Sequence, residues 1–137
     1  IFLKNKLIGK YTVEEIKLEF QQYYARLLCL EDVSETYLSW LNDQDVIEFL
    51  EVKFVHYTLD ELKAYVQSFV DTEGKFLFGI FDKDNDNHVG NATIYNIDQN
   101  RGTFDIGYLI GEKEYWGKDA STAALLMMRS IRLKLLV

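Results

Sequence analysis

Three apolar segments near the middle of the chain, separated only by short polar turns, constrain the fold more than any other feature of the sequence. They cover residues 76–81, 89–97 and 103–110. The turns at 82–87 and 100–102 are rich in Asp, Asn and Gly, residues that favour tight turns. Parallel strands need a crossover of a dozen or more residues, so segments this close together are expected to pair as an antiparallel meander.

Helical patterns precede and follow this meander. Thr58 and Glu61 have the spacing of a capping box, in which each side chain bonds the other residue's backbone N–H, and they predict a helix start. Asp32 with Glu35 predicts an earlier helix start in the same way. The other elements expected from periodicity are a strand at 23–30 and helices at 45–50 and 120–134.

The order of these elements predicts an α+β fold, a mostly antiparallel sheet with helices packed on it. Thr12 with Glu15 gives a further capping box. We therefore expect residues 1–20 to form a leader with a short helix, followed by one domain over residues 21–137. A chain of 137 residues is long enough for one domain with its own core.

Composition excludes several classes of protein. Hydrophobic residues make up 48% and charged residues 27%, as in globular domains rather than disordered chains. No apolar run reaches the roughly 20 residues that a membrane span requires. The formal net charge of −7 disfavours nucleic acid, whose phosphates need a basic surface. A single cysteine, Cys29, and the lack of a signal-peptide pattern favour the cytoplasm.

The most informative segment runs from 107 to 125, where an apolar strand is followed by a loop of small residues and then by a helix. The first turn of a helix has free N–H groups and the positive end of the helix dipole. Small residues there let the backbone approach a phosphate oxygen, so such a loop can bind a pyrophosphate. The spacing differs from that of a P-loop, and an ordinary strand–loop–helix connection would give a similar pattern.

This segment resembles the acyl-CoA loop of the GNAT superfamily, whose branch near ribosomal-protein and aminosugar N-acetyltransferases has approximately Tyr-Trp-Gly-Lys-Gly-x-Ala-Thr-Glu-Ala. Departures occur at Asp119, where the family has Gly, at Ser121, where it has Ala, and at Ala123, where it has Glu. The matching residues are Tyr115, Trp116, Gly117, Lys118, Thr122 and Ala124.

Three other short motifs carry the same resemblance, which extends over about residues 24–129. They are Val89-Gly90-Asn91, which is similar to the family's Ile-Gly-Asn, Asp105-Ile106-Gly107-Tyr108, which is similar to Glu/Asp-Ile-Gly-Tyr, and Ser39-Trp40-Leu41-Asn42-Asp43, which is similar to a Trp-Leu-Asn-Asp helix end.

The resemblance implies an N-acetyltransferase that moves an acetyl group from acetyl-CoA to a primary amine. The expected acceptor is an aminosugar or nucleotide-linked aminosugar, or else a protein N-terminus. A non-catalytic, truncated domain that binds CoA weakly or not at all remains the alternative. The residues that the resemblance assigns to acetyl-CoA are Leu109, Ile110, Trp116, Gly117, Lys118, Asp119, Ala120, Ser121 and Thr122.

Direct acyl transfer needs a group that takes a proton from the amine, and Asp105 is our candidate for this base. Period-2 alternation places Asp105 on the same strand face as Gly107 and Leu109, where Gly107 leaves room for the pantetheine. A solvent-facing strand carboxylate is the other interpretation. Tyr108 is expected either in the acceptor pocket or in the core. Glu48 and Glu51 are expected either to attract a cationic acceptor or to lie on a helix surface.

The family also implies a further strand, helix and hairpin after the helix at 120–134, and residues 129–137 resemble that region poorly. We therefore expect a fold with helices on both faces of the sheet and its C-terminal strands missing, so that residues 21–137 form a partial domain. The strand at 103–110 would then be an open edge. An open apolar edge favours pairing with another chain, so self-association, or else disorder of the last helix, is expected.

Two other patterns contain residue types that can bind metals, but neither has the spacing of a metal site. Residues 82–86, Asp-Lys-Asp-Asn-Asp, imitate the start of a calcium loop, but the sixth position is Asn87 rather than Gly and the twelfth is Thr93 rather than Glu, so a hairpin turn is expected. His56 and His88 share no ligand spacing with Cys29, so no zinc site is expected.

Overall fold

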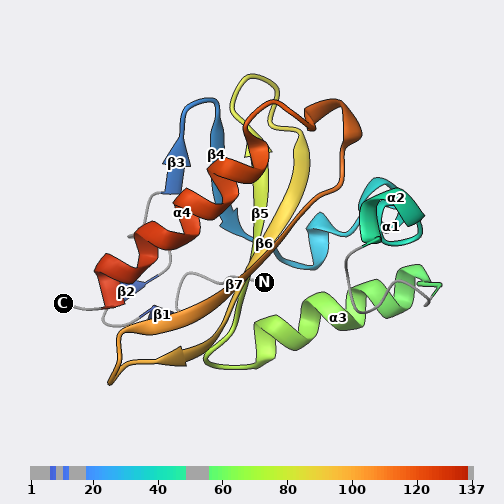
Figure 1. Ribbon diagram of the computed structural model, residues 1–137. Coiled ribbons are helices and arrows are strands. Elements are labelled where there is room, and N and C mark those ends of the chain that lie inside the picture. Colours follow the sequence, from blue (N-terminus) through green and yellow to red (C-terminus); the bar gives the residue numbers. More distant parts are fainter. Residues whose placement is uncertain (1–6, 9–10, 13–17, 49–55, 136–137) are drawn as a thin grey trace.

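A five-stranded antiparallel sheet with the order β3-β4-β5-β6-β7 runs through the molecule (Figure 1). The structure, a computed structural model, describes residues 7–8, 11–12, 18–48 and 56–135. The strands are β3 (Leu18–Phe20), β4 (Tyr23–Leu27), β5 (Phe76–Asp82), β6 (His88–Asp98) and β7 (Thr103–Ile110). The last three are neighbours in chain order, which confirms the expected meander.

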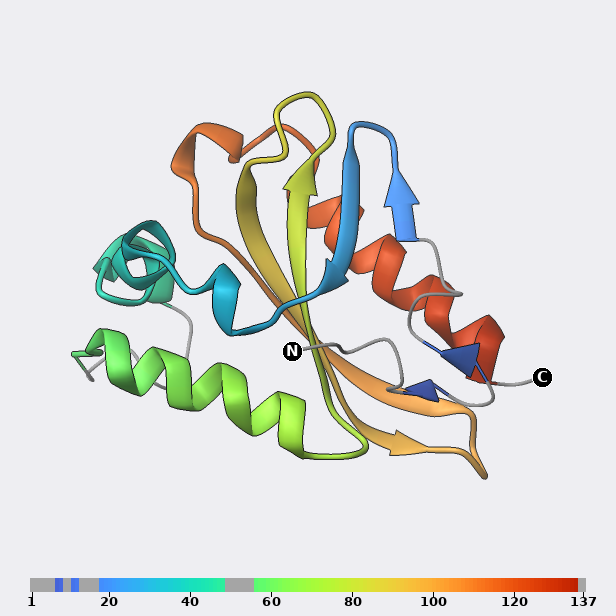
Figure 2. The same ribbon diagram turned by 180° about the vertical axis from the view of Figure 1, so that it is seen from behind.

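Helices cover both faces of the sheet, as expected (Figures 1 and 2). The long C-terminal helix α4 (Ala120–Leu135) packs on one face. On the other face lie α1 (Glu35–Leu41), α2 (Gln44–Ile47) and α3 (Leu59–Asp71). The smaller elements are β1 (Leu7–Ile8), which pairs with β2 (Tyr11–Thr12), and two 3-10 turns, η2 (Leu30–Asp32) and η3 (Lys113–Tyr115). Among the described residues, no helix is both long and apolar enough to cross a membrane.

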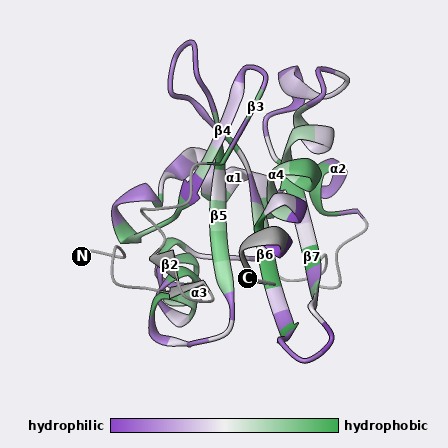
Figure 3. Ribbon diagram, turned by 90° about the vertical axis from the view of Figure 1, so that its left-hand side faces the viewer, coloured by the Kyte–Doolittle hydropathy of each residue, from purple (hydrophilic) through white to green (hydrophobic). Residues whose placement is uncertain are grey.

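Several boundaries follow directly from the sequence. The Thr58–Glu61 capping box is formed, with the Glu61 N–H donating to the Thr58 hydroxyl and the Thr58 N–H to the Glu61 carboxylate. Helix α3 then buries Leu62, Val66 and Phe69, the face that its periodicity predicts. β5 is buried along its whole length and is coloured as strongly hydrophobic in Figure 3, which suits a central strand covered on both sides.

The expected helix start at Asp32 is wrong, and so is the expected strand end at residue 30. The strand ends at Leu27 and helix α1 begins at Glu35, capped by Ser34, whose hydroxyl accepts the Tyr37 N–H at 3.0 Å. The Asp32 carboxylate instead binds the Arg26 guanidinium, at 2.8 and 2.9 Å, and accepts the Cys29 N–H at 2.9 Å. A charged partner six residues away therefore outweighs the local capping pattern.

Near the start of the chain, the helix expected after Thr12 falls on residues 13–17, which lie outside the described residues. Thr12 pairs with Leu7 in the small hairpin, and Glu15 lies outside the described residues. Leu18–Phe20 then forms strand β3 at the edge of the main sheet. The short helix α2 begins at Gln44, capped by Asp43, one residue before the expected start at 45, and residues 49 and 50 of the helix expected at 45–50 are also outside the described residues.

Candidate functional site

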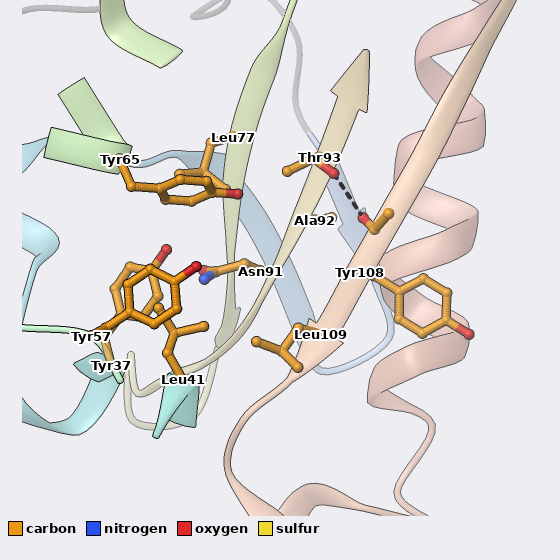
Figure 4. A pocket seen from close by; sticks show the side chains of 11 residues that line it. Tyr37, Leu41, Tyr57, Tyr65, Leu77, Asn91, Ala92, Thr93, Tyr108 and Leu109 are labelled. Atoms are coloured by element: carbon orange, nitrogen blue, oxygen red, sulfur yellow. Dashed lines mark hydrogen bonds between the residues drawn. The ribbon is translucent and has the colours of Figure 1, made fainter. Parts of the chain in front are cut away.

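A cavity of about 180 Å³ lies between strands β5–β7 and helices α1 and α3 (Figure 4). Three tyrosines from three different parts of the chain form one of its walls: Tyr37 of α1, Tyr57 of the segment before α3, and Tyr65 of α3. The sheet forms the opposite wall. The other lining residues are Leu41, Leu77, Asn91, Ala92, Thr93, Gly107, Tyr108 and Leu109.

The alternation of β7 decides which of its side chains face this cavity. Phe104, Ile106 and Ile110 pack against the core beneath α4, so Gly107 and Leu109 face the other way, toward the cavity. Figure 4 shows the ring of Tyr108 on the α4 side of the strand, away from the three tyrosines. Tyr108 borders the cavity but is 47% exposed, so neither of its expected roles, pocket wall or core residue, describes its ring.

A hydrogen-bonded pair of polar side chains, His88 and Asn91, borders the floor of the cavity. Nε2 of His88 lies 2.7 Å from Oδ1 of Asn91, and the Tyr37 hydroxyl interacts with the same amide side chain. An amide oxygen only accepts, so Nε2 carries a proton. Burial lowers the pKa of His88 below its ordinary value and raises that of Tyr37, so both groups are neutral at pH 7.

Helix α1 is fixed to the segment after β7 by the residues of the Trp-Leu-Asn-Asp motif. Trp40 lies so close to Gly111 that any side chain at 111 would collide with its ring. The Trp40 indole N–H donates to Glu112 at 2.9 Å. One residue further on, the Lys113 ammonium binds Asp43 and Asp45, at 2.9 and 3.0 Å.

The same motif also places one of the cavity tyrosines. Asn42 exchanges two hydrogen bonds with the backbone of Tyr57, at 2.9 and 3.0 Å. The motif therefore has a clear structural role, because it joins α1 both to the loop after β7 and to the cavity wall.

The loop from Tyr115 to α4 presents a row of backbone donors. Gly117 and Asp119 have φ angles of +77° and +65°, in the left-handed region. The Asp119 carbonyl accepts the Ala123 N–H at 2.9 Å and so starts the helix. Within the described chain, the structure records no acceptor for the backbone N–H groups of residues 119–122. Free donors at a helix start, next to left-handed residues, form a nest suited to an anion such as a pyrophosphate.

Asp119 is the residue of this row whose negatively charged side chain does not suit an anion site. Its side chain makes no recorded hydrogen bond to the Ser121 or Thr122 N–H, although a capping role was one interpretation of this residue. A cap normally has extended backbone angles, whereas Asp119 is left-handed, a conformation that favours Gly. Asp119 is exposed, so its charge lies beside the donors but in contact with solvent.

The residues expected to contact acetyl-CoA lie along one path from the cavity to α4. Leu109 lines the cavity, and the carbonyl of Ile110, the last residue of β7, accepts the Trp116 indole N–H at 2.8 Å. Trp116 is 46% exposed, so most of its ring faces solvent. The remaining residues follow in the loop and first helical turn, where Gly117, Lys118, Asp119, Ser121 and Thr122 are exposed and Ala120 is buried.

Asp105 lies on the cavity side of β7 but does not line the cavity. Its carboxylate is exposed and accepts the Asn96 amide at 2.9 Å. Glu48 is exposed at the end of α2, and Glu51 lies outside the described residues. The position of Asp105 agrees with its expected strand face and leaves its catalytic role as a prediction.

Sequence reasoning missed the cavity tyrosines and the His88–Asn91 pair as site residues. Tyr65 has a signal in the sequence, because an aromatic residue lies outside the apolar face of α3. Tyr57 has none, because it belongs to no element. No group of three metal-ligating side chains occurs among the described residues, and burial raises the pKa of the Cys29 thiol to about 11, which makes it a poor nucleophile.

Comparisons with known proteins identify the family. The sequence pattern of the acetyltransferase (GNAT) domain matches residues 24–134. No curated protein matches the sequence. An acetyltransferase of the GNAT family from Bacillus anthracis has the same fold, with a TM-score of 0.71 and 15% identity over 87% of this chain and 67% of the other.

Two other solved structures have the fold at similarly low identity. The ribosomal-protein-S5-alanine acetyltransferase from Vibrio fischeri is 20% identical over 87% of this chain and 68% of its own, with a TM-score of 0.61. A nucleotide-linked sugar GNAT is 18% identical over 82% and 63%, with a TM-score of 0.66.

Across the solved acetyltransferases compared, this chain spans 56–69% of their length. The match to the family pattern extends over most of this chain, from β4 to the last turn of α4. The chain therefore belongs to the GNAT family of acetyltransferases.

Proposed function

We propose that this protein transfers an acetyl group from acetyl-CoA to a primary amine. The proposal rests on one observation: strand β7 borders the tyrosine cavity, and the segment that directly follows β7 leads to the free N–H groups before α4. Gly107 and Leu109 line the tyrosine cavity, and the segment that follows the same strand ends in the free N–H groups of residues 119–122. A pyrophosphate at those donors and a thioester beside β7 would place the acetyl group at the cavity.

The acceptor we propose is an aminosugar or nucleotide-linked aminosugar, with a protein N-terminal amine next. Tyrosine rings offer flat apolar faces together with hydroxyl groups, and this combination suits the faces and hydroxyls of a sugar ring. Tyr37, Tyr57 and Tyr65 supply both in one small cavity. One solved relative in fold is a nucleotide-linked sugar GNAT, and another acts on a ribosomal-protein alanine.

In the proposed reaction the neutral amine attacks the thioester carbonyl, the new C–N bond forms, and CoA leaves as the thiolate. A backbone N–H of β7 would stabilise the oxyanion. The amine loses a proton, and we propose Asp105 as its final acceptor. Because Asp105 does not line the cavity, the proton would pass through water.

Two measurements test the proposal. Calorimetric titration with acetyl-CoA tests donor binding, and release of free CoA thiol tests turnover. The acceptor panel should pair glucosamine, a nucleotide-linked aminosugar and a short peptide with their N-acetylated counterparts, which have no free amine. We expect thiol release only with the free amines. Thiol release that is independent of the amine would contradict acetyl transfer to nitrogen.

The position of Asp119 favours a second candidate, a domain that binds CoA weakly and does not catalyse transfer. A carboxylate beside the donors repels a pyrophosphate, by roughly 3 kcal/mol for unit charges about 5 Å apart at an effective dielectric of about 20, before screening by solvent. Weak acetyl-CoA binding together with no thiol release for any amine of the panel would support this candidate.

A further inference from the structure

Two buried tyrosines lie directly beneath the loop that presents the free donors. The Tyr23 hydroxyl donates to the Lys118 carbonyl at 2.8 Å, and the Tyr115 hydroxyl donates to the Asp82 carboxylate at 2.6 Å. Tyr23 is 0% exposed and Tyr115 is 8% exposed. Their rings meet edge to face with centroids 6.3 Å apart, so the two hydrogen bonds belong to one packed unit.

The partner of Tyr115 belongs to the turn whose sequence imitates a calcium loop. Asp82 is only 5% exposed, and its two oxygens have separate tasks. One accepts the Asp84 N–H at 2.9 Å and shapes the turn, while the other accepts the Tyr115 hydroxyl. The Asn85 amide also approaches the Tyr115 hydroxyl, at 3.4 Å. The turn between β5 and β6 therefore supports the loop before α4.

These bonds lie at the part of the loop that most needs support. Lys118, whose carbonyl Tyr23 holds, stands between the left-handed residues Gly117 and Asp119. A left-handed non-glycine residue is strained and persists only where its surroundings fix it. Tyr23 fixes the peptide between the two left-handed residues, and Tyr115 fixes the residue at which the loop begins.

We propose that Tyr23 and the Asp82–Tyr115 pair are positioning residues that hold the N–H groups of residues 119–122 in the arrangement that binds the pyrophosphate of CoA. The inference rests on the proposed function for its ligand. The physical reason is preorganisation, because a loop already fixed in its binding conformation loses less entropy when the anion arrives. Burial raises the pKa of Tyr23, and the bond to Asp82 raises that of Tyr115, so both remain hydrogen-bond donors at neutral pH.

The test removes single hydroxyl groups and compares two ligands. Tyr23→Phe and Tyr115→Phe keep the rings and delete the bonds. Tyr24→Phe is the matched control, because Tyr24 is next to Tyr23 and donates to Asp86 of the same turn at 2.9 Å without touching the loop. Calorimetry with CoA should give about 10-fold weaker binding for the first two variants, and an unchanged value for Tyr24→Phe.

Pantetheine, which lacks the pyrophosphate, separates positioning from general damage to the fold. Its affinity should stay within about twofold of wild type in all three variants. Equal losses for CoA and pantetheine would overturn the proposal, because they would show a structural effect on the whole site. Unchanged CoA affinity in Tyr23→Phe and Tyr115→Phe would also overturn it.

Hydrogen exchange of the ligand-free protein decides the positioning role independently of CoA. The hydrogen-bonded amides on either side of the free donors, Lys118, which donates to the Tyr115 carbonyl, and Ala123, which donates to the Asp119 carbonyl, should exchange faster in Tyr23→Phe and Tyr115→Phe than in wild type or Tyr24→Phe. Unchanged exchange in both variants would overturn the positioning role even if CoA binds. Failure of wild type to bind CoA, with the exchange difference present, would instead overturn the proposed function and keep the positioning of the loop.

Discussion

The two faces of the central sheet are covered by different kinds of side chain. On the α4 face, aliphatic and aromatic residues of the strands pack against Ala120, Ala123 and Ala124, whose small side chains let the helix approach closely. On the face covered by α1 and α3, aromatic rings predominate and surround His88, while Asn91 and the cavity lie beside them. One sheet thus supports a close-packed apolar core and a polar, partly hollow site.

We expect this difference to separate the residues that stabilise the fold from those that serve the proposed function. Burial of apolar area on the α4 face stabilises the fold without any need for partners. On the other face each buried polar group needs a hydrogen bond, and His88 and Asn91 provide one for each other. The loop at 111–119 joins β7 to α4 and so connects the two faces. Substitutions on either face and in the loop test this division.

The largest expected effect is on the free energy of unfolding, and it concerns two neighbouring residues of β5 that point to opposite faces of the sheet. Phe78→Ala removes a ring that is 1% exposed in the α4-face core, and it should lower the free energy of unfolding by about 3–5 kcal/mol. Leu77→Ala borders the existing cavity and should cost less, near the lower end of about 2–5 kcal/mol. Urea unfolding measures both. A greater loss at Leu77 than at Phe78 would contradict the division between the faces.

A catalytic effect is expected from Asp105 on the cavity side of β7. If Asp105 is the final proton acceptor, Asp105→Asn should lower kcat by about 10²-fold with little change in CoA affinity. Asp98→Asn is the matched control, since Asp98 lies in the same hairpin and binds Arg101 at 3.8 Å. Thiol-release kinetics measure kcat for both. Wild-type turnover in Asp105→Asn would remove this residue from the mechanism.

A smaller effect is expected in the loop that joins the two faces. Asp119→Gly should tighten CoA binding by about 10-fold, because it removes a like charge and admits the backbone more closely. It should also raise stability by up to about 1 kcal/mol, since the structure shows a left-handed residue without a capping bond. Calorimetry at two salt concentrations and urea unfolding measure the two effects.

Gly117→Ala is the control for this loop, because it should lower the stability that Asp119→Gly should raise. An added Cβ meets no atom within 4 Å, but φ is +77°, so the change should destabilise the protein through the backbone alone. Equal CoA affinity in wild type and Asp119→Gly would mean that the Asp119 side chain points away from the phosphates.

The smallest expected effect is on how stability depends on pH, and it arises from His88. Its folded pKa is lowered from 6.5, chiefly by burial, so the unfolded chain binds more protons than the folded chain just below pH 6.5. Stability should therefore be fully present above pH 6.5 and should fall as the pH drops from 6.5 through the folded pKa. Urea unfolding at several pH values measures the slope.

His88→Gln should flatten this dependence, while exposed His56 gives the control His56→Gln, which should keep it. A wild-type slope in His88→Gln would assign the effect to another group.

The sequence by itself determined the elements whose signals are local. The short turns between β5, β6 and β7 leave antiparallel pairing as the only arrangement, and the Thr58–Glu61 box and the apolar face of α3 depend on neighbours within one or two turns. The anion-binding character of the loop before α4 could also be predicted from the sequence, because an anion nest is built from consecutive backbone N–H groups.

Only the tertiary structure decided which residues share a site and which local signal prevails. Tyr37, Tyr57 and Tyr65 come from separate segments and meet only when α1 and α3 pack on the sheet. Asp32 has the spacing of a cap and Asp82 that of a calcium ligand, but Arg26 and Tyr115 bind their carboxylates instead. A carboxylate forms its strongest bonds with whichever donors folding brings within reach, and sequence spacing cannot show partners such as Tyr115, 33 residues from Asp82.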